Sequence, residues 1–243
     1  MIKRLLDITA SLFGLLALSP LLVPVMVLIF LQDHHSPFYI APRVGRGGRQ
    51  FQMIKLRSMV ANADKVGGDS TASNDHRITA IGAFIRRFKL DEIPQLWNVL
   101  KGDMSLVGPR PNVQRETDLY TEEERHLLDV RPGITDLASI VFADEGEILK
   151  DHPDPDLGYN QLIRPWKSRL GLLYVKSSGL VLDLRLIVFT LINVMSREKA
   201  LAAVEHMLKG LNTPEDVIRV SRRQSPLVPH PPPGSEQIVM SRS

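Results

Sequence analysis

Residues 8–31 read ITASLFGLLALSPLLVPVMVLIFL, and this stretch of 24 residues without a formal charge decides the first feature of the fold. A helix rises about 1.5 Å per residue, so the stretch is long enough to cross the ~30 Å hydrocarbon core of a bilayer. A cleaved signal peptide has a shorter apolar segment and a small-residue cleavage site, whereas Gln32-Asp33-His34-His35 follows here. The stretch therefore predicts a membrane element.

Two prolines near the middle of the stretch, Pro20 and Pro24, predict a bend, because proline removes a helical hydrogen bond and crowds the preceding turn. Ser19 is placed to bond a carbonyl group that the bend leaves free. Basic residues flank the stretch on both sides: Lys3, Arg4, Arg43, Arg46, Arg49, Lys55 and Arg57. Since positive charge stays on the cytoplasmic side, these flanks favour a re-entrant hairpin that enters and leaves on one face. A kinked full span is the alternative.

The rest of the chain has the composition of a folded protein and an uneven distribution of charge. Its 243 residues are 44% hydrophobic and 23% charged, which excludes collagen-like, coiled-coil and wholly disordered classes, and the absence of cysteine excludes thiolate chemistry. Residues 1–111 carry 14 Lys and Arg against 8 Asp and Glu, residues 112–156 carry 4 against 13, and residues 157–243 carry 12 against 6. The two basic blocks predict binding of anions such as phosphates or acidic lipid headgroups. Charge alone leaves nucleic acid open.

The remaining pattern predicts an α/β fold that is mostly helical. Residues 36–57 form extended pieces around a glycine turn, which predicts a short β-hairpin. Helical spacing covers residues 78–89, and a second helix follows from the acidic start at residue 91 to the Lys101-Gly102 stop. Thr121-Glu-Glu-Glu124 is a capping box. Residues 166–176 mix rings, cations and leucine as amphipathic helices at a bilayer interface do.

These elements divide the chain into three parts. Residues 1–36 form the membrane helix, residues 37–205 form a small cytoplasmic domain, and residues 206–243 form a proline-rich extension that we expect to be largely disordered. Residues 60–75 are polar and predict a loop or a short helix. Residues 180–195 are apolar but contain two charges, so we expect a core or surface-lying helix there.

Asp91 and Glu92 are the sharpest candidates for catalysis. They open a helix, where backbone N–H groups and the helix dipole favour a bound phosphate. Arg86, Arg87 and Lys89 precede them closely, so the group could hold a divalent cation, attack phosphorus and neutralise the developing charge. Taken alone, the dipeptide is more often a pair of capping acids beside a solvated basic face.

Four further cations are candidate phosphate ligands. Arg110 lies between two prolines, which gives its fork of donors a stiff mount, and Arg131 precedes a Pro-Gly turn. Lys55 and Arg57 alternate along a predicted strand and would share one face. Each has a structural alternative, either as a plain turn arginine or as a contact with lipid headgroups.

Two weaker signals point elsewhere. Asp154-Pro155-Asp156 matches the Asp-x-Asp pattern that many glycosyltransferases use for a metal-bound nucleotide, although acids among prolines more often form a solvated loop. The seven histidines have no spacing typical of zinc ligands.

Three motifs carry a resemblance to a known family: Lys55-Leu-Arg-Ser-Met59, the run RRFKLDEIPQLWNVLKGDMSLVGPRP over residues 86–111, and Arg131-Pro-Gly-Ile-Thr135. Together they resemble the bacterial sugar transferases called monotopic phosphoglycosyl transferases. The resemblance extends over about residues 1–195. It includes the apolar run broken at Ser19-Pro20, which in this family is a re-entrant hairpin in the cytoplasmic leaflet.

The resemblance implies that residues 37–205 are a catalytic domain at the cytoplasmic face of the bacterial inner membrane. The implied reaction moves a sugar 1-phosphate from a UDP-sugar to a polyprenyl phosphate such as undecaprenyl phosphate, with release of UMP, early in a glycan pathway such as exopolysaccharide synthesis. Asp91 is the implied nucleophile, which forms a covalent phosphosugar, Glu92 is its partner, and Mg²⁺ bridges Asp91 and the substrate phosphates. The implied phosphate ligands are Lys55, Arg86, Arg110 and Arg131, and Arg57 stays a candidate from its place beside Lys55 on the predicted strand. The resemblance implies no nucleic acid and leaves a homo-oligomer open.

Two departures from the family pattern bear on specificity. Gly171 stands where the family commonly has an acid, and Asp136 begins a stretch that in the family begins with glycine. The stretch after residue 135 is therefore a candidate for sugar or nucleotide selection. Two rival functions stay open, namely a metal-dependent glycosyltransferase that uses Asp154 and Asp156 and releases UDP, and a non-catalytic membrane-anchored scaffold. The sequence does not specify the sugar.

Overall fold

The computed structural model describes residues 2–63 and 70–241, so part of the segment predicted as a loop or short helix, residues 64–69, lies outside the described residues. The first half of the chain contains α1 Ile2–Asp33, β1 Phe38–Val44, β2 Gln50–Leu56, α2 Ala80–Arg87, η3 Leu90–Glu92, α3 Gln95–Lys101, β3 Ser105–Val107 and α4 Gln114–Asp118. The second half contains η4 Glu124–Asp129, β4 Gly133–Thr135, α5 Leu137–Val141, α6 Glu145–Leu149, α7 Pro155–Gly158, η5 Tyr159–Ile163, α8 Arg164–Ser177, α9 Leu180–Met195, α10 Arg197–Gly210 and α11 Glu215–Ser221. The predicted mostly helical α/β class is confirmed.

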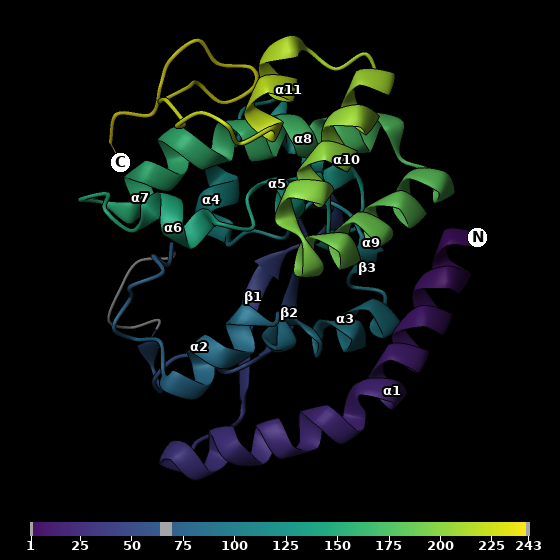
Figure 1. Ribbon diagram of the computed structural model, residues 1–243, viewed down its shortest axis with the longest axis vertical. Helices are drawn as coiled ribbons and strands as arrows, with labels where there is room; N and C mark the ends of the chain where they lie inside the picture. Colours follow the sequence, from purple (N-terminus) through teal and green to yellow (C-terminus); the bar gives the residue numbers. More distant parts are fainter. Residues whose placement is uncertain (1, 64–69, 242–243) are drawn as a thin grey trace.

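Helix α1 is a single helix that contains both prolines and changes direction midway (Figure 1). The Ser19 hydroxyl donates to the Leu16 carbonyl at 2.8 Å. That carbonyl lies four residues before Pro20, which has no N–H to offer it, so the serine satisfies the group that the proline leaves free. Among the described residues, α1 is the one helix that is long and apolar enough to cross a membrane. The segment that the sequence predicts as a re-entrant membrane hairpin is thus a continuous, bent helix.

Both ends of α1 are fastened to the same folded body. At the first turn, Lys3 Nζ lies 2.6 Å from the buried Asp183 carboxylate of α9. One turn later, the buried Asp7 accepts hydrogen bonds from the Ser105 hydroxyl and the Leu106 N–H of β3. At the last turn, the Asp33 carboxylate pairs bidentately with Arg57 at 2.5 and 2.6 Å.

The two sheets are small, and each one positions some of the basic side chains named above. Strands β1 and β2 form the predicted antiparallel hairpin, with Phe38 opposite Leu56. Strands β3 and β4 are parallel. Gly108, just after β3, and Gly133, at the start of β4, approach so closely that a Cβ on Gly133 would lie 2.1 Å from the Gly108 nitrogen. Only glycine fits there, and the contact fixes the turn that carries Arg110.

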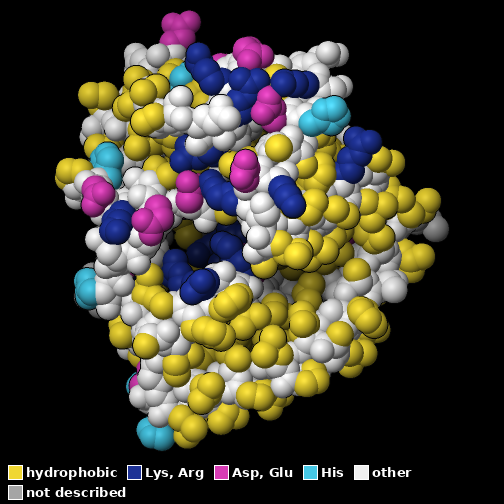
Figure 2. All heavy atoms as spheres, viewed as in Figure 1, with side chains coloured by type: hydrophobic (Ala, Val, Ile, Leu, Met, Phe, Trp, Pro, Cys, Tyr) yellow, Lys and Arg dark blue, Asp and Glu magenta, His cyan; other side chains and the backbone are white. Residues whose placement is uncertain are grey.

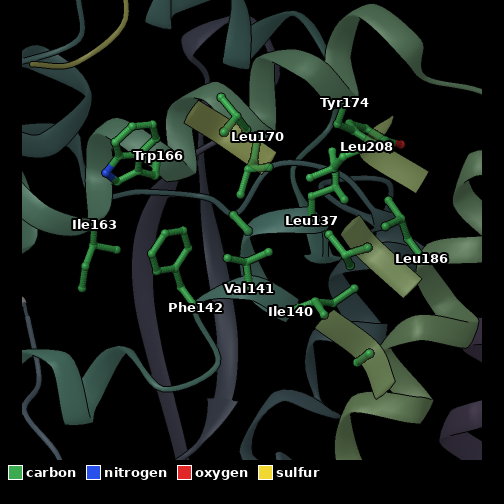
Figure 3. Packing of buried hydrophobic residues seen from close by; sticks show 14 of the residues in the cluster. Leu137, Ile140, Val141, Phe142, Ile163, Trp166, Leu170, Tyr174, Leu186 and Leu208 are labelled. Carbon is green, nitrogen blue, oxygen red and sulfur yellow. The ribbon is translucent and has the colours of Figure 1, made fainter. Parts of the chain in front are cut away.

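The main hydrophobic core lies between α5, α8, α9 and α10, away from the second half of α1 (Figure 1). Figure 3 shows Trp166, Leu170 and Tyr174 of α8 directed at Leu137, Val141 and Leu186. The prediction that residues 166–176 lie at a bilayer interface is therefore wrong. The rings and leucines recur at i, i+4 and i+8, which places them on one helix face that packs into the core.

The C-terminal extension differs from the predicted disorder. Helix α10 crosses the predicted boundary at residue 206, and its Ala200, Val204 and Leu208 are buried in the main core. Beyond α11, the His230 ring stacks on Trp166 at 4.4 Å between centroids, and the Arg169 guanidinium donates to the Pro231 carbonyl at 3.0 Å. Prolines have little conformational freedom to lose, so a few such contacts are enough to hold the segment against α8.

Candidate active site

Asp91 and Glu92 lie in η3, a short turn that joins α2 to α3. Lys89 immediately before it has a left-handed backbone with φ of 56°, which turns the chain sharply between the two helices. Gly102 ends α3 with φ of 94°, as the Lys-Gly stop predicts. Figure 2 shows a hollow lined by Lys and Arg side chains between the apolar lower part of the molecule and the helices above it.

Glu92 is held by two cations. Arg110 donates to both of its carboxylate oxygens, with Nη1 at 3.3 Å from Oε2 and Nη2 in closer contact with Oε1. Lys55 Nζ lies 3.5 Å from Oε1. Burial disfavours the ionised form of Glu92, but the attraction of Arg110 and Lys55 outweighs it and holds the pKa well below its ordinary range. Glu92 is therefore a fixed anion that orients Arg110 and Lys55.

Asp91 is in a different state. Its side chain is buried, and its Oδ1 atom has no hydrogen-bond partner among the described residues. Burial raises the pKa of this carboxyl, and repulsion from Glu92 adds to the effect, while Lys55 opposes it. A carboxylate with an unpaired oxygen beside an arginine and a lysine can attack an electrophile or bind a cation.

The structure brings together only some of the predicted phosphate ligands. Lys55 and Arg110 meet at Glu92, and Arg86 of α2 has a guanidinium without a partner among the described residues, free for a ligand. Strand β2 ends at Leu56, so Arg57 lies beyond the strand and does not share a face with Lys55. Arg57 is instead buried against Asp33 and anchors α1. The Arg131 Nε atom donates to the Gly102 carbonyl at the far end of α3.

The Asp-x-Asp motif has a structural role. The Asp154 carboxylate caps α7 by accepting from the N–H groups of Asp156 and Leu157. Asp156 is buried and accepts from the Ser70 N–H at 2.8 Å. Both carboxylates are thus engaged with backbone. No cluster of three His, Asp or Glu side chains suited to a metal ion occurs within residues 2–63 and 70–241.

A second group of polar residues lies near Arg110, and of its members the sequence singled out only Asp136, at the start of the stretch named above for sugar or nucleotide selection. A cavity on the other side of Arg110 is lined by Asn112, Tyr120, Asp136 and Tyr159. The tyrosines lie far apart in sequence and carry no motif. The one local signal that could have drawn attention to Asn112 is its position directly after Pro111.

Comparison with known proteins gives the chain's relatives. It is 39% identical to the Sinorhizobium fredii exopolysaccharide production protein ExoY over 57% of this chain and 68% of that protein. It is 39% identical to the Aeromonas hydrophila UDP-N-acetylgalactosamine-undecaprenyl-phosphate N-acetylgalactosaminephosphotransferase over 62% of this chain. It is 36% identical to the Xanthomonas campestris UDP-glucose:undecaprenyl-phosphate glucose-1-phosphate transferase over 82% of this chain. The chain spans only 38% and 40% of the lengths of the last two proteins.

The family comparison covers most of the chain. The family model described as bacterial sugar transferase matches residues 1–197, which include α1, the hairpin, the Asp91-Glu92 dyad, Arg110 and α9. The match confirms the resemblance that the three motifs carry, and it confirms that the chain is a transferase. The chain belongs to the bacterial sugar transferase family.

Proposed function

We propose that this chain transfers a sugar 1-phosphate from a UDP-sugar to undecaprenyl phosphate through a covalent intermediate on Asp91. The observation that carries the proposal is the state of the dyad. Asp91 has a buried oxygen without a partner, while Glu92 beside it is an anion locked to Arg110 and Lys55. The names of the relatives support the two substrates, since the Aeromonas and Xanthomonas proteins are named for UDP-sugar donors and undecaprenyl phosphate.

The first step is attack by the Asp91 carboxylate on the phosphorus bonded to the sugar. An Asp91 O–P bond forms, the bond from this phosphorus to the oxygen bridging to the uridylyl phosphate breaks, and UMP leaves with that oxygen. In the second step, a phosphate oxygen of the lipid attacks the same phosphorus, and the bond to Asp91 breaks. The carboxylate is regenerated, and the product is the lipid-diphosphate sugar. The two bulky anions occupy the site in turn.

The cations around the dyad have separate tasks in this reaction. Arg110 presents a rigid fork of donors suited to a diphosphate, and Lys55 adds a compact charge next to the reacting oxygen. Arg86, whose guanidinium has no partner among the described residues, is available to the incoming phosphates. Glu92 keeps the first two cations in place until the substrate arrives. Charge that develops on the transferred phosphoryl group is thereby met by groups already oriented toward it.

The residues present fit a magnesium ion. Asp91 Oδ1 is a buried carboxylate oxygen without a partner among the described residues, and Mg²⁺ is usually held by one or two carboxylates together with substrate phosphates and water. Asp91 would hold the ion on the protein side. When bound, it would neutralise negative charge on the substrate phosphates.

The layout of α1 supports a re-entrant placement on the cytoplasmic face of the membrane. Lys3 and Asp33, at its two ends, are both paired with residues of the same folded body, so both ends stay on one side. The apolar side chains between them are largely exposed, as are Phe84 of α2, Phe88 directly after α2 and Trp97 of α3. The dyad lies between these exposed rings in sequence. Asp91 would thus sit at the level of the lipid headgroups, where a soluble donor and a membrane-bound acceptor can both reach it.

The proposal is tested by incubating the detergent-solubilised protein with Mg²⁺, undecaprenyl phosphate and a panel of UDP-sugars, and by measuring UMP. We expect UMP release by the wild-type chain and a loss of at least ~10³-fold in the Asp91→Asn variant, which has no nucleophilic carboxylate. Intact-mass measurement in the absence of lipid should show one phosphosugar on the wild-type protein. Release of UDP in place of UMP would instead indicate a glycosyltransferase of the Asp-x-Asp type.

The matched control is Asp154→Asn, because Asp154 only caps α7 and asparagine is an equally good cap. This variant should release UMP at the wild-type rate. An Asp91→Asn variant that turns over normally, or an active preparation in which no adduct forms, would contradict the covalent mechanism. Epitope tags placed before and after residues 1–36 should report the same compartment, and opposite compartments would replace the re-entrant helix with a full span.

A further inference from the structure

The cavity behind Arg110 is a polar opening in the surface of the molecule. Its interior, about 40 Å³, has room for only a few water molecules, and its mouth is open to solvent. Arg110 forms part of its wall, and the remainder comes mainly from the start of α5, from η5 and from α8. The relatives are named for different sugars, N-acetylgalactosamine in one case and glucose in another, so some part of the fold must distinguish sugars.

Asp136 provides the cavity with a carboxylate that is only half used. The residue is 2% exposed and caps α5. Its Oδ1 atom accepts from the Ser139 N–H at 2.7 Å and from the Ser139 hydroxyl at 2.6 Å. Its Oδ2 atom has no hydrogen-bond partner in residues 2–63 and 70–241, although Asp136 lines the cavity. The Oδ2 atom is therefore open to the cavity, where water or a ligand can donate a hydrogen bond to it.

The other polar groups of the wall suit a ligand rich in hydroxyl groups. The Tyr120 hydroxyl accepts from Asn112 at 2.8 Å and keeps its own proton available to donate. Lys167 is tied to the Glu145 carboxylate and lies 5.3 Å from the centre of the Tyr159 ring. The wall thus offers acceptors, hydroxyl donors and a ring face, the combination that hydrogen-bonds to a sugar and packs against its C–H groups.

Arg110 joins this cavity to the reaction centre. On one side its guanidinium holds Glu92, next to Asp91, and on the other it lines the cavity. In the donor substrate, the sugar is bonded directly to the phosphate group that Asp91 attacks. A phosphate held between Asp91 and Arg110 therefore carries its sugar to one side of the arginine.

We infer that the sugar ring of the donor docks at the mouth of this cavity and that Asp136 accepts a hydrogen bond from one of its hydroxyl or acetamido N–H groups, which makes Asp136 a specificity-determining residue. This inference rests on the proposed function, because it places the donor at the same site. The lipid acceptor does not compete for the cavity. The lining elements α5 and α8 lie away from the second half of α1 and from the apolar surface (Figure 1).

The test uses the Asp136→Asn variant of the full chain. Asparagine retains the cap of α5 and the shape of the side chain but turns the free oxygen into an N–H donor. We expect kcat/KM for the preferred UDP-sugar to fall about 10- to 100-fold, the effect of one hydrogen bond to a charged group. The preference among UDP-glucose, UDP-galactose and their N-acetylamino counterparts should change, whereas inhibition by UMP should not.

Deoxy analogues of the preferred sugar identify the contact. In the wild-type chain, the analogue that lacks the contacting hydroxyl should lose about the same factor as D136N does. In D136N, that analogue should show no further loss, while analogues altered elsewhere should still do so. The matched control D154N should leave the ranking of sugars unchanged. If D136N does not fold, Tyr159→Phe provides a second change in the same wall, with a smaller but equally sugar-dependent loss.

A uniform decrease for every UDP-sugar and every analogue, accompanied by weaker inhibition by UMP, would overturn the inference, because the cavity would then hold the uridine. The proposed function would survive that result. If the wild-type chain releases no UMP from any UDP-sugar, the proposed function is wrong and the inference falls with it. The two failures are therefore distinguishable.

Discussion

Asp91 and Glu92 are neighbours in sequence, yet their surroundings shift their pKa values in opposite directions. Burial dominates at Asp91 and raises its pKa. At Glu92, the attraction of Arg110 and Lys55 overcomes an equally unfavourable burial and lowers the pKa. Two carboxylates whose pKa values are shifted apart in this way can take different roles in catalysis. Glu92 keeps its charge and its partners, and Asp91 is the group whose protonation state changes with conditions.

The raised pKa of Asp91 predicts the acid limb of the first chemical step. Only the ionised carboxylate attacks, so adduct formation should decline as the pH falls through a pKa above the ordinary aspartate value of 3.8. Lys55 lowers this pKa by its charge, and Lys55→Met should therefore move the limb to higher pH. Single-turnover adduct formation, followed by mass spectrometry of quenched samples, measures the limb directly. A limb at or below pH 3.8 would contradict the burial of Asp91.

The site could be predicted from the sequence as far as its motifs are local. Asp91, Glu92 and Arg110 lie in one run of 26 residues, from 86 to 111, and the structure brings them into contact. Arg57 belongs to an equally basic stretch, but its role depends on Asp33, 24 residues earlier. Asp136 begins a stretch that the sequence links to substrate selection, but nothing local shows which oxygen of this side chain stays open. Its open oxygen becomes visible only when α5, α8 and the Arg110 turn are placed together.

At the scale of elements, the contact between the end of β3 and the start of β4 is tightly constrained. A Cβ on Gly133 would lie 2.1 Å from the Gly108 nitrogen and 2.5 Å from its carbonyl oxygen, and neither backbone atom can move as a flexible side chain would. Gly133→Ala should therefore lower the free energy of unfolding by about 3 kcal/mol or more, measured by urea unfolding in detergent. Because this contact positions the Arg110 turn, UMP release should fall as well.

The matched control for this prediction is Gly210→Ala at the end of α10, where an added Cβ would meet nothing within 4 Å. That change should be neutral or slightly stabilising, because alanine is the better helix former by up to about 1 kcal/mol. Equal stabilities for G133A and the wild-type chain would show that the two strands do not approach as closely as described.

Elements with strong local signals could be predicted, and their placement could not. The hairpin, the Gly102 stop and the Thr121–Glu124 capping box are all present, the last with reciprocal bonds of 3.1 Å. Helix α8 has the composition of an interfacial helix and is a core helix. The composition of α8 does not show which surface the helix packs against. That surface is formed by α5, α9 and α10, which come from other parts of the chain.

At the scale of the whole molecule, the C-terminal segment is a strap over α8 on the side away from the membrane helix (Figure 1). It contacts Trp166, Arg169 and Gln161 and has no contact with the dyad among the described residues. A chain that ends at residue 224 should therefore unfold at least ~2 °C lower. Its Trp166 fluorescence should move toward that of exposed indole, while UMP release stays within about threefold of the full chain. Loss of activity with unchanged stability would instead assign the strap a role in catalysis.

The attachment of α1 at both ends has a consequence for the range of membranes in which the protein can work. A helix that traverses a bilayer must match its thickness, and it tilts or deforms the lipid when it does not. In the re-entrant placement proposed above, a helix whose first and last turns are both fastened to one body makes no such demand, because it enters only one leaflet. The depth of immersion, and with it the height of the reacting phosphorus above the acyl chains, is then set by the protein itself. Catalysis should be insensitive to acyl-chain length.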